Sequence, residues 1–242
     1  MTGRIYGDLV GWYRLLDPVA DHLDEATAYR SALERAAGPS AETLLELGAG
    51  AGNNAFFLKQ RFRCTLTDVS ETMLALSREQ NPECEHLVGD MRILRLGRAF
   101  DCVLVHDAIM YMTSAGDLAA AIETAFVHTG PGGAALFAPD YVRERFREGS
   151  EQHAADEGAR SMRCLEWHWD PDPADDTYRV EYAFLVREGA ELTAAHDTHV
   201  EGLFARDTWV ELLSKAGFAV ELVERPFDDT ETDLVFLCRR PA

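Results

Sequence analysis

Glycines and an acid follow each other at fixed spacing near the start of the chain, in a pattern that could bind a nucleotide-like ligand. Residues 44–47 are mostly apolar and predict a short buried strand that carries one acid, Glu46. Gly48, Gly50 and Gly52 then alternate with alanines. Because glycine has no Cβ atom, the backbone of such a turn can approach a ligand closely, and the next helix N-terminus can face it. The pattern predicts a nucleotide cradle, although a strand-to-helix turn without a ligand would have the same sequence.

Acids also follow the next two predicted strands, at 64–67 and 86–88. Asp68 stands 20 residues after Gly48, and a carboxylate at this strand end can accept hydrogen bonds from both hydroxyls of a ribose. Asp90 follows the other strand after one glycine. Acids at strand ends are common on protein surfaces. The spacing from the glycine turn, and not the acid alone, therefore favours a ribose site at Asp68.

The residues after the most apolar strand could carry the chemistry itself. Residues 100–105 predict a central parallel strand buried on both faces, since five of the six are apolar. His106 and Asp107 come next, and Tyr111 follows in an apolar run. Ligands of open α/β sheets bind beyond the carboxyl ends of the strands, so His106 or Asp107 could act as a general base. The simpler alternative makes Asp107 a helix cap and Tyr111 a packing residue.

Strands and helices alternate along the chain, which predicts an α/β fold with a doubly wound, mainly parallel sheet. Two further strands are expected after residue 217. The expected parallel strands are 44–47, 64–67, 86–88, 100–105 and 134–138, and the expected helices are 8–37 with a break at Pro18, 53–62, 71–80, 116–128 and 207–216. Within a single domain, 1–242, we expect an N-terminal helical lid at 1–40, a cofactor-binding core at 41–140, an antiparallel insert at 151–204, and a C-terminal helix with strands at 205–242.

The insert is strongly acidic and should form one wall of the substrate site. Residues 151–201 contain 13 acids and 4 basic residues, a net charge of 4 − 13 = −9. Three antiparallel strands are expected at 164–169, 178–187 and 198–204, and strict alternation places the apolar side chains of the second on one face. A solvated acidic face is the alternative to a substrate wall.

Charge and composition exclude several classes of partner. The chain carries 23 basic and 42 acidic residues, a formal net charge of −19, which repels nucleic acid and anionic membrane surfaces. No apolar stretch is long enough to span a bilayer, and the first residues lack the apolar core of a signal peptide. The five cysteines form no C-x-x-C pair, which favours reduced thiols and a cytoplasmic location.

A metal ion is not expected. His196 and His199 are three positions apart, and on a strand this spacing puts two side chains on opposite faces, so they cannot share an ion. Only a helix at this point would bring them together.

Several motifs together resemble a known enzyme family. The run Glu46-x-Gly48-x-Gly50-x-Gly52 resembles the first motif of class I S-adenosylmethionine (SAM) dependent methyltransferases. Asp68, the Asp90–Met91 pair and the Pro131-Gly132-Gly133 turn resemble later features of that family, in the same order. The resemblance is strongest over residues 40–140. In the flanks, the N-terminal helices and the insert are similar to enzymes that N-methylate amino sugars carried on nucleotides. The family implies a Rossmann-like sheet of seven strands whose last strand is antiparallel.

The resemblance implies that SAM is the cofactor. The backbone of Gly48, Ala49 and Gly50 would approach the methionine portion, with Glu46 supporting its ammonium. Asp68 would hold the ribose, and Asp90 with Met91 the adenine. The full set of expected cofactor residues is Tyr13, Glu46, Gly48, Ala49, Gly50, Asp68, Val69, Asp90, Met91 and His106.

The chemistry implied is methyl transfer from SAM to an amine or hydroxyl of a small molecule, for example an amino sugar or another natural-product intermediate. The protein must hold the acceptor in line with the methyl group and manage one proton. We expect three catalytic residues, His106, Asp107 and Tyr111, and a substrate side lined by Asp140 and His168 with Tyr13 reaching in from the lid.

Two other classes of function remain open at this point. A non-catalytic SAM-binding protein, such as a regulator or an assembly partner, would share residues 44–91. A nicotinamide-dependent oxidoreductase would need a third glycine where Asn53 stands, which counts against it. A homodimer also remains open.

Overall fold

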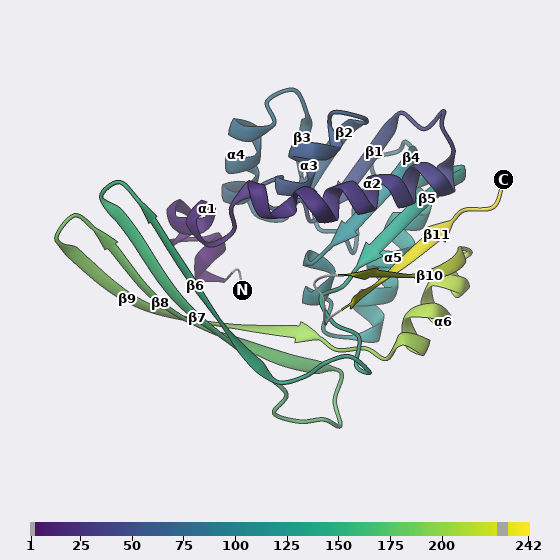
Figure 1. The fold of residues 1–242 in the computed structure, drawn as a ribbon. Coiled ribbons are helices and arrows are strands. Elements are labelled where there is room, and N and C mark those ends of the chain that lie inside the picture. Colours follow the sequence, from purple (N-terminus) through teal and green to yellow (C-terminus); the bar gives the residue numbers. More distant parts are fainter. Residues whose placement is uncertain (1–2, 227–231) are drawn as a thin grey trace.

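The computed structural model describes residues 3–226 and 232–242 and contains two β-sheets (Figure 1). The first sheet has seven strands in the spatial order β10 (Ala219–Pro226), β11 (Thr232–Arg239), β5 (Thr129–Ala138), β4 (Phe100–His106), β1 (Thr43–Leu47), β2 (Arg63–Asp68) and β3 (Glu85–Val88). The second is a meander of β6 (Gly149–Glu157), β7 (Arg160–Trp169), β8 (Thr177–Glu188) and β9 (Glu191–Gly202). The predicted α/β fold with an additional antiparallel sheet is confirmed.

The carboxyl ends of the central strands meet at one edge of the first sheet. β1 pairs in parallel with β2 and with β4, and Leu47 lies opposite Thr67 on one side and Val105 on the other. The residues that follow these strands are therefore neighbours. β11 pairs antiparallel with both β5 and β10, as the family resemblance implied for the last strand.

Helices cover both faces of this sheet and bury its two sets of apolar side chains. One face packs Leu44, Leu66 and Leu104 beneath α2 (Leu23–Ala37) and α3 (Asn53–Leu58). The other packs Val103 and Val105 beneath α5 (Ala115–His128) and α6 (Arg206–Ala216). α4 (Glu71–Gln80) lies beside β2 and β3 and begins at Ser70, whose hydroxyl accepts a hydrogen bond from Met73 N as an N-cap. Two-sided burial explains the nearly continuous apolar runs of the strands.

The N-terminal segment is less regular than predicted. The structure has the short helix α1 (Tyr13–Leu16) among 3₁₀ turns, and regular helix begins only at Leu23. Ile5 and Leu9 pack against Phe184 of the second sheet, so this segment joins the two sheets. Figure 1 shows it between α4 and the second sheet, with the N-terminus near the centre of the molecule.

The second sheet differs from the prediction in one strand. β6 precedes the three expected strands and pairs with β7 along its whole length. In β8, Tyr178, Val180, Phe184 and Val186 are buried, which confirms the face predicted from their alternation. The sheet extends well beyond the first one in Figure 1.

Two smaller elements were also predicted imperfectly. The helix expected at 53–62 ends at Leu58. The Pro131-Gly132-Gly133 turn is a bulge inside β5, where the register with β4 shifts between Phe100 and Cys102. Among the described residues, no helix has the length and apolarity required to cross a membrane.

Candidate functional site

The three glycines after β1 are needed for different physical reasons. Gly48, Gly50 and Gly52 have φ angles of 78°, 53° and 74°, a region that other residues disfavour. A Cβ atom on Gly48 would also collide with Ala108, and one on Gly52 with Ser77, so these two glycines allow close packing inside the protein. At Gly50 the nearest side-chain atom would be 3.6 Å away, an ordinary contact. Gly50 is thus the part of the turn best able to meet a ligand.

Asp68 closes this turn from the end of β2. Its Oδ2 accepts a hydrogen bond from Gly50 N at 2.9 Å, and its Oδ1 accepts one from Ser70 N at 2.8 Å. Burial raises the pKa of Asp68, and these backbone donors oppose the shift. The carboxylate therefore has a fixed orientation beside Gly50, while the adjacent Val69 is exposed.

Glu46 places a buried carboxyl group next to the glycine turn. It is the last residue but one of β1 and is almost fully buried. Its Oε2 has no hydrogen-bond partner among the described residues, and burial raises the pKa of Glu46 to about 8. A buried acceptor without a partner is costly unless a donor or a cation reaches it. Glu46 could therefore receive an ammonium group and would ionise when it does so.

Asp90 and Met91 follow β3, and the protein itself engages both. Each Asp90 oxygen accepts a hydrogen bond from Arg92 Nε at 3.0 Å, and Oδ2 also accepts one from Nη2 at 2.6 Å. The Arg92 guanidinium holds the pKa of Asp90 below its ordinary value. Met91 is buried, and its methyl group lies where a Cβ atom on Gly48 would press on it. Met91 thus packs directly against the glycine turn.

The end of β4 contains a strained residue. Asp107 has φ 33° and ψ −55° and is, within the described part of the chain, the one non-glycine residue with a positive φ. Such conformations cost about 1–3 kcal/mol and cluster at functional sites. Asp107 precedes the short helix η4 (Ala108–Tyr111), yet its side chain makes no capping hydrogen bond, so the helix-cap alternative is wrong. Its Oδ1 instead lies 2.7 Å from His106 Nε2.

Acids on two sides favour the charged form of His106. Its Nε2 also lies 3.4 Å from Glu25 Oε2. Burial would lower the pKa of His106, but the charges of Asp107 and Glu25 outweigh burial and raise it well above its ordinary value. Desolvation would raise the pKa of Asp107, but His106 outweighs it and lowers that pKa. Because the Asp107 side chain is 54% exposed, this ion pair, and not burial, sets its charge.

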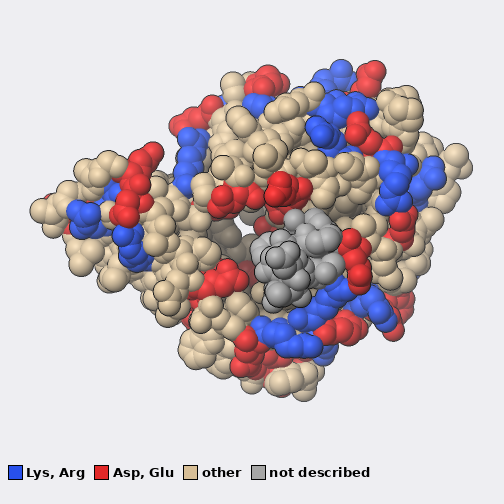
Figure 2. Space-filling model, viewed as in Figure 1, with Lys and Arg blue, Asp and Glu red and all other residues tan. Residues whose placement is uncertain are grey.

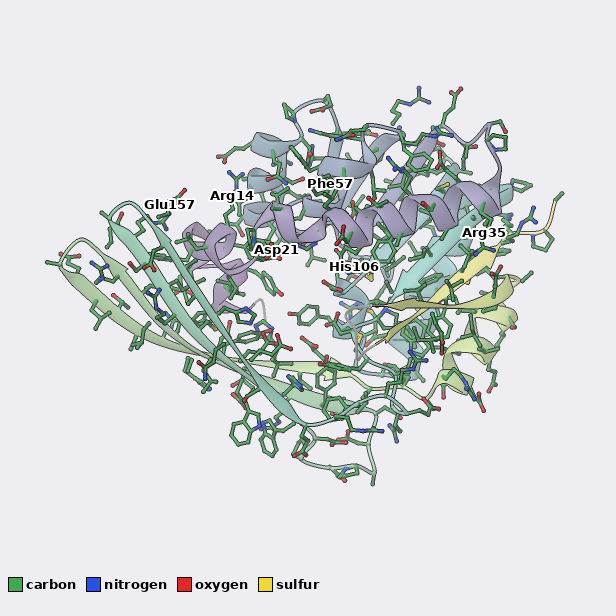
Figure 3. All side chains as sticks on the ribbon, in the orientation of Figure 1. Arg14, Asp21, Arg35, Phe57, His106 and Glu157 are labelled. Atoms are coloured by element: carbon green, nitrogen blue, oxygen red, sulfur yellow. The ribbon has the colours of Figure 1, made fainter. Side chains whose placement is uncertain are left out.

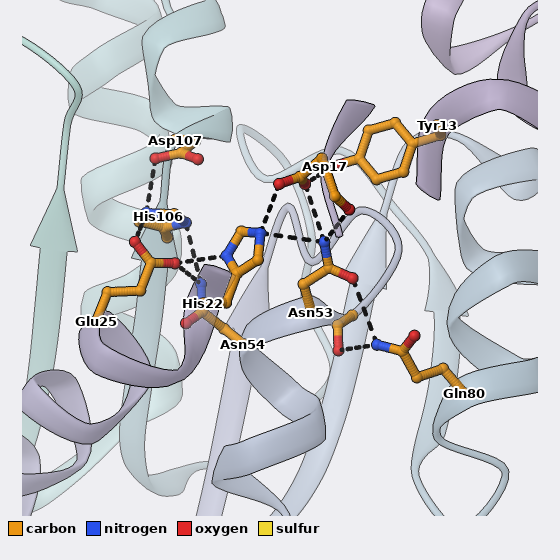
Figure 4. A network of polar contacts seen from close by, with 10 residues as sticks. Tyr13, Asp17, His22, Glu25, Asn53, Asn54, Gln80, His106 and Asp107 are labelled. Atoms are coloured by element: carbon orange, nitrogen blue, oxygen red, sulfur yellow. Dashed lines mark hydrogen bonds and ion pairs between the residues drawn. The ribbon is translucent and has the colours of Figure 1, made fainter. Parts of the chain in front are cut away.

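A chain of alternating charges continues from His106 into the N-terminal segment (Figure 4). Glu25 Oε1 lies 2.6 Å from His22 Nδ1, and His22 Nε2 lies 2.6 Å from Asp17 Oδ1. Tyr13 donates a hydrogen bond to Asp17 at 2.6 Å. Burial would lower the pKa of His22, but its hydrogen bonds with Asp17 and Glu25 outweigh burial and raise it to about 10. Tyr13 is thereby connected to the end of β4.

Sequence reasoning missed this network. Asn53 and Asn54 brace it, because Asn53 Nδ2 donates to Asp17 at 2.9 Å and Asn54 Nδ2 donates to Glu25 at 2.8 Å. The three-residue spacing of His22 and Glu25 could have indicated a pair on one helix face. Nothing in the sequence indicated that their partner follows a strand far along the chain.

The two residues predicted to face the substrate line one cavity. Asp140 and His168 are both in the wall of a space of about 590 Å³ that also exposes Arg145 and Arg147. Desolvation and the charge of Asp107 raise the pKa of Asp140. Because Asp140 is exposed, the nearby charge of Asp107 is the firmer of these two causes. Figure 3 shows His106 facing the central space between the two sheets, and Figure 2 shows carboxylates around the hollow in this face.

The predicted separation of the two histidines on β9 is observed. His199 is buried, whereas His196 is exposed and lies 2.9 Å from Glu181. In the ranges 3–226 and 232–242, no three His, Cys, Asp or Glu side chains are arranged to hold a metal ion.

Known proteins share both the sequence and the fold of this chain. Residues 44–133 match the family described as a methyltransferase domain. The chain is 29% identical over 195 residues to dTDP-3-amino-3,4,6-trideoxy-alpha-D-glucopyranose N,N-dimethyltransferase of Streptomyces venezuelae, which covers 79% of this chain and 81% of that protein. It is 28% identical over 196 residues to dTDP-3-amino-3,6-dideoxy-alpha-D-glucopyranose N,N-dimethyltransferase of Streptomyces fradiae, with 80% and 76% covered.

A solved structure has the same fold along nearly the whole chain. SAM-bound CalS10, an amino pentose methyltransferase from Micromonospora echinaspora, superposes with a TM-score of 0.81 at 24% identity and covers 96% of each chain. CalS10 and both sequence relatives are described as methyltransferases, which are catalytic proteins.

Proposed function

Because the chain is a SAM-dependent methyltransferase, we propose that it methylates the amine of an amino sugar carried on a nucleoside diphosphate. The names of the two sequence relatives specify an amino sugar on dTDP and two methyl transfers to its nitrogen. We therefore propose an N,N-dimethylated product. Hydroxyl methylation is the competing outcome of the test below.

Two features of this chain suit the binding of SAM on the cofactor side of the site. The unpartnered, buried Oε2 of Glu46 suits an ammonium group, and Gly50 leaves the backbone accessible beside Asp68. Glu46 would hold the methionine ammonium, Asp68 the ribose hydroxyls and Asp90 the adenine amine, with Met91 beneath the ring. SAM supplies, when bound, a methyl group on a positively charged sulfur, which is already a strong electrophile.

The observation that carries the proposal is the ionised Asp107 in its strained position after β4. Asp107 would align an N–H of the acceptor and stabilise the positive charge that the nitrogen gains as the methyl group arrives. The protonated His106 holds Asp107 in place and keeps it ionised. When it carries a proton, Asp140 could donate a hydrogen bond to the acceptor or to Asp107. An amine suits this arrangement better than a hydroxyl, because a hydroxyl needs a stronger base to remove its proton.

Arginines in the cavity suit the phosphates of such an acceptor. The chain is strongly acidic, so a diphosphate needs local positive charge. Arg143, Arg145 and Arg163 pair with Asp176, Glu224 and Asp156. Arg147 donates to two backbone carbonyls and, within the described residues, makes no ion pair. We propose that Arg147, with Arg145 beside it, receives the diphosphate.

The proposal includes the setting in which the enzyme works. The charge of −19 supports the absence of nucleic-acid and membrane partners, and the free cysteines support a cytoplasmic location.

Leu165, Trp167 and Leu185 are exposed on the second sheet, which supports a homodimer through that sheet. Sedimentation of the protein with and without a Trp167→Lys substitution tests the dimer, since a dimer through this sheet should dissociate in the variant.

Incubation with SAM and a set of acceptors tests the function. Three acceptors are compared: dTDP-3-amino-3,6-dideoxy-glucose, the same amino sugar without its nucleotide, and the 3-hydroxy sugar on dTDP. The second and the third each differ from the first in one feature. We expect mass spectrometry to find two added methyl groups on the first, slower methylation of the second, and none on the third. Methylation of the hydroxy sugar alone, or of RNA or DNA added as a competitor, would contradict the proposal.

A further inference from the structure

We propose that Asp197 and His199 are a positioning pair that orients the Tyr111 hydroxyl in the acceptor site and connects it to the N-terminal turn Gly3–Ile5. The inference rests on the proposed function, because it places Tyr111 on the acceptor side of the methyl-transfer site. It gives a role to two buried polar residues of β9.

A continuous line of polar contacts joins these residues. His199 Nδ1 lies 2.8 Å from the Tyr111 hydroxyl, and His199 Nε2 lies 3.2 Å from Asp197 Oδ2. Since a carboxylate can only accept a hydrogen bond, Nε2 must carry a proton, and the ring orientation is then fixed with Nδ1 toward Tyr111. His199 is only 4% exposed and Asp197 only 8%. The two side chains share the inner face of β9 because they are two positions apart on a strand.

The N-terminal turn completes this line from the other side. Asp197 Oδ2 accepts hydrogen bonds from Arg4 N and, at 3.3 Å, from Ile5 N. A Cβ atom on Gly3 would collide with His199, so the turn can approach the histidine only because position 3 is glycine. The carbonyl of Tyr6 accepts a hydrogen bond from Thr72 Oγ1 at 2.7 Å. The turn thus bridges the second sheet and the start of α4.

Tyr111 lies where an acceptor would meet the end of β4. It belongs to the short helix that begins directly after Asp107 and is 37% exposed, so its ring reaches solvent while its hydroxyl is held. Its oxygen also lies 3.0 Å from the Tyr6 hydroxyl. Desolvation raises the pKa of both phenols, so both remain neutral. The rings of Tyr6 and Tyr111 also meet edge to face, with their centroids 6.2 Å apart.

This arrangement would make the Tyr111 hydroxyl a preset contact for the acceptor. With His199 in place, the hydroxyl has one orientation before the acceptor arrives, so no rotational freedom is lost on binding. Without His199 the same hydroxyl could rotate. The acceptor would then be bound in several orientations, and only some would place its nitrogen in line with the methyl group. A purely structural role for His199 would instead lower stability and leave turnover unchanged.

Two substitutions of the same histidine separate these roles. The His199→Asn amide reaches the position of Nδ1 and can still contact Tyr111, whereas the His199→Gln amide extends toward Asp197 and leaves Tyr111 without a partner. With dTDP-3-amino-3,6-dideoxy-glucose as acceptor, we expect kcat to fall about tenfold or more in His199→Gln and less than threefold in His199→Asn. SAM affinity should be unchanged in both. His196→Gln, an exposed neighbour on the same strand, should match the wild type.

A double-mutant cycle shows whether His199 acts through Tyr111. If it does, His199→Gln should lower kcat no further once Tyr111→Phe is present, because contacting residues that act as a unit are not additive. Equal effects of His199→Gln in both backgrounds would overturn the proposal. So would a loss of melting temperature with normal kcat. Gly3→Ala, remote from the acceptor, should also lower kcat by displacing His199.

A measurement without any acceptor keeps this test independent of the proposed function. The ¹⁵N chemical shifts of the His199 ring report which nitrogen carries a proton and whether the other is hydrogen-bonded. Tyr111→Phe should shift the Nδ1 resonance and leave the Nε2 resonance in place, and Asp197→Asn should do the reverse. Unchanged shifts in both variants would overturn the positioning pair. Expected shifts in a protein that methylates no amino sugar would overturn the proposed function alone.

Discussion

The two sides of the central space are built in different ways. On the proposed cofactor side, Glu46, Gly50 and Asp68 lie at or just after the ends of neighbouring parallel strands, and backbone N–H groups orient Asp68. On the acceptor side, side chains from distant parts of the chain orient one another, as His199 and Tyr111 do. Groups fixed by short-range geometry do not depend on how distant segments of the chain pack. Long-range side-chain contacts can change with the acceptor while the cofactor side stays intact.

This difference implies that substitutions on the two sides have separable effects. Changes on the cofactor side should alter SAM affinity, and changes on the acceptor side should alter turnover or the acceptor KM. A variant that altered SAM affinity and turnover to the same extent would show that the two sides do not act separately. The expected effects are largest at the end of β4, where the two sides meet.

Asp107→Asn should give the largest effect. Asparagine tolerates the positive φ at this position but lacks the charge that we propose stabilises the acceptor nitrogen. We expect methyl transfer to slow by roughly ten- to a thousandfold, with SAM affinity within about threefold, or about 0.65 kcal/mol. Single-turnover kinetics and titration calorimetry on the same preparation measure the two quantities.

The matched control for Asp107 lies at the opposite end of the same strand. Asp101 Oδ2 accepts hydrogen bonds from Glu42 N and Thr43 N, both at 2.9 Å. Asp101→Asn should lower stability by about 1–3 kcal/mol and leave kcat near normal. If Asp107→Asn behaved in the same way, with a lower melting temperature and normal kcat, Asp107 would be structural, and the group that assists transfer would have to be sought at Asp140 or His168.

Asp68→Ala should weaken SAM binding at least tenfold. The carboxylate would be lost as an acceptor for the ribose, and hydrogen bonds to charged groups contribute about 1.5–3 kcal/mol each. Titration calorimetry of SAM measures the effect directly. Ser70→Ala is the control, because it removes the N-cap of α4 and should cost about 1 kcal/mol of stability without affecting SAM. Unchanged SAM affinity in Asp68→Ala would remove the ribose assignment.

The cofactor side was also the part that could be read from the sequence. Its groups lie at strand ends within a short stretch, so periodicity and spacing predicted the fold and assigned Asp68 to the same site as the glycine turn. The hydrogen bond from Gly50 N to Asp68 was seen only in the structure. The network of polar contacts that connects His106 to Tyr13 could not be predicted in this way. The partners His106 and Glu25 are joined only when α2 packs over the ends of β1 and β4. Likewise, the 3₁₀ turns of the N-terminal segment are set by packing against Phe184 of the second sheet, and that packing depends on contacts that no local pattern records.

Asp107 shows the same limit within a single residue. Its position at the sheet edge followed from the apolar strand before it. Its strained backbone and its ion pair with His106 did not, because a local pattern equally suited a helix cap. Only the structure shows that the carboxylate turns toward His106 and away from the helix N-terminus.

SAM affinity should depend on pH through Glu46. Because burial raises the pKa of Glu46 to about 8, the unbound protein holds this group protonated at pH 7, and binding of an ammonium must release the proton. Affinity should therefore rise nearly tenfold, at most one factor of ten per pH unit, between pH 6 and pH 7. The amino group of SAM stays charged in this range, since α-amino groups titrate at about 7.7–8.0.

Glu46→Gln should remove this dependence. Its SAM affinity should be nearly flat between pH 6 and pH 7 and weaker than that of the wild type at pH 7. The same linkage acts on folding with the opposite sign. The raised pKa means that the folded state binds more protons than the unfolded one between about pH 4.5 and pH 8, so the free energy of unfolding of the unbound wild type should fall across this range. A wild-type SAM affinity independent of pH would show that Glu46 does not meet the ammonium.

The smallest expected effect is on the acceptor side, at Arg147. It lines the cavity with Asp140 and His168, and a partly exposed cation gains only modest Coulomb energy from a phosphate. Arg147→Ala should raise the KM for a dTDP-linked amino sugar about three- to fivefold, or roughly 0.7–1 kcal/mol, and make that KM less sensitive to salt. SAM affinity and the KM for the free amino sugar should not change. Arg163→Ala is the control, since Arg163 lies on the second sheet but pairs with Asp156 outside this cavity. A rise in both KM values, or an equal effect of Arg163→Ala, would mean that Arg147 contributes only to the general field of the protein and that the diphosphate lies elsewhere.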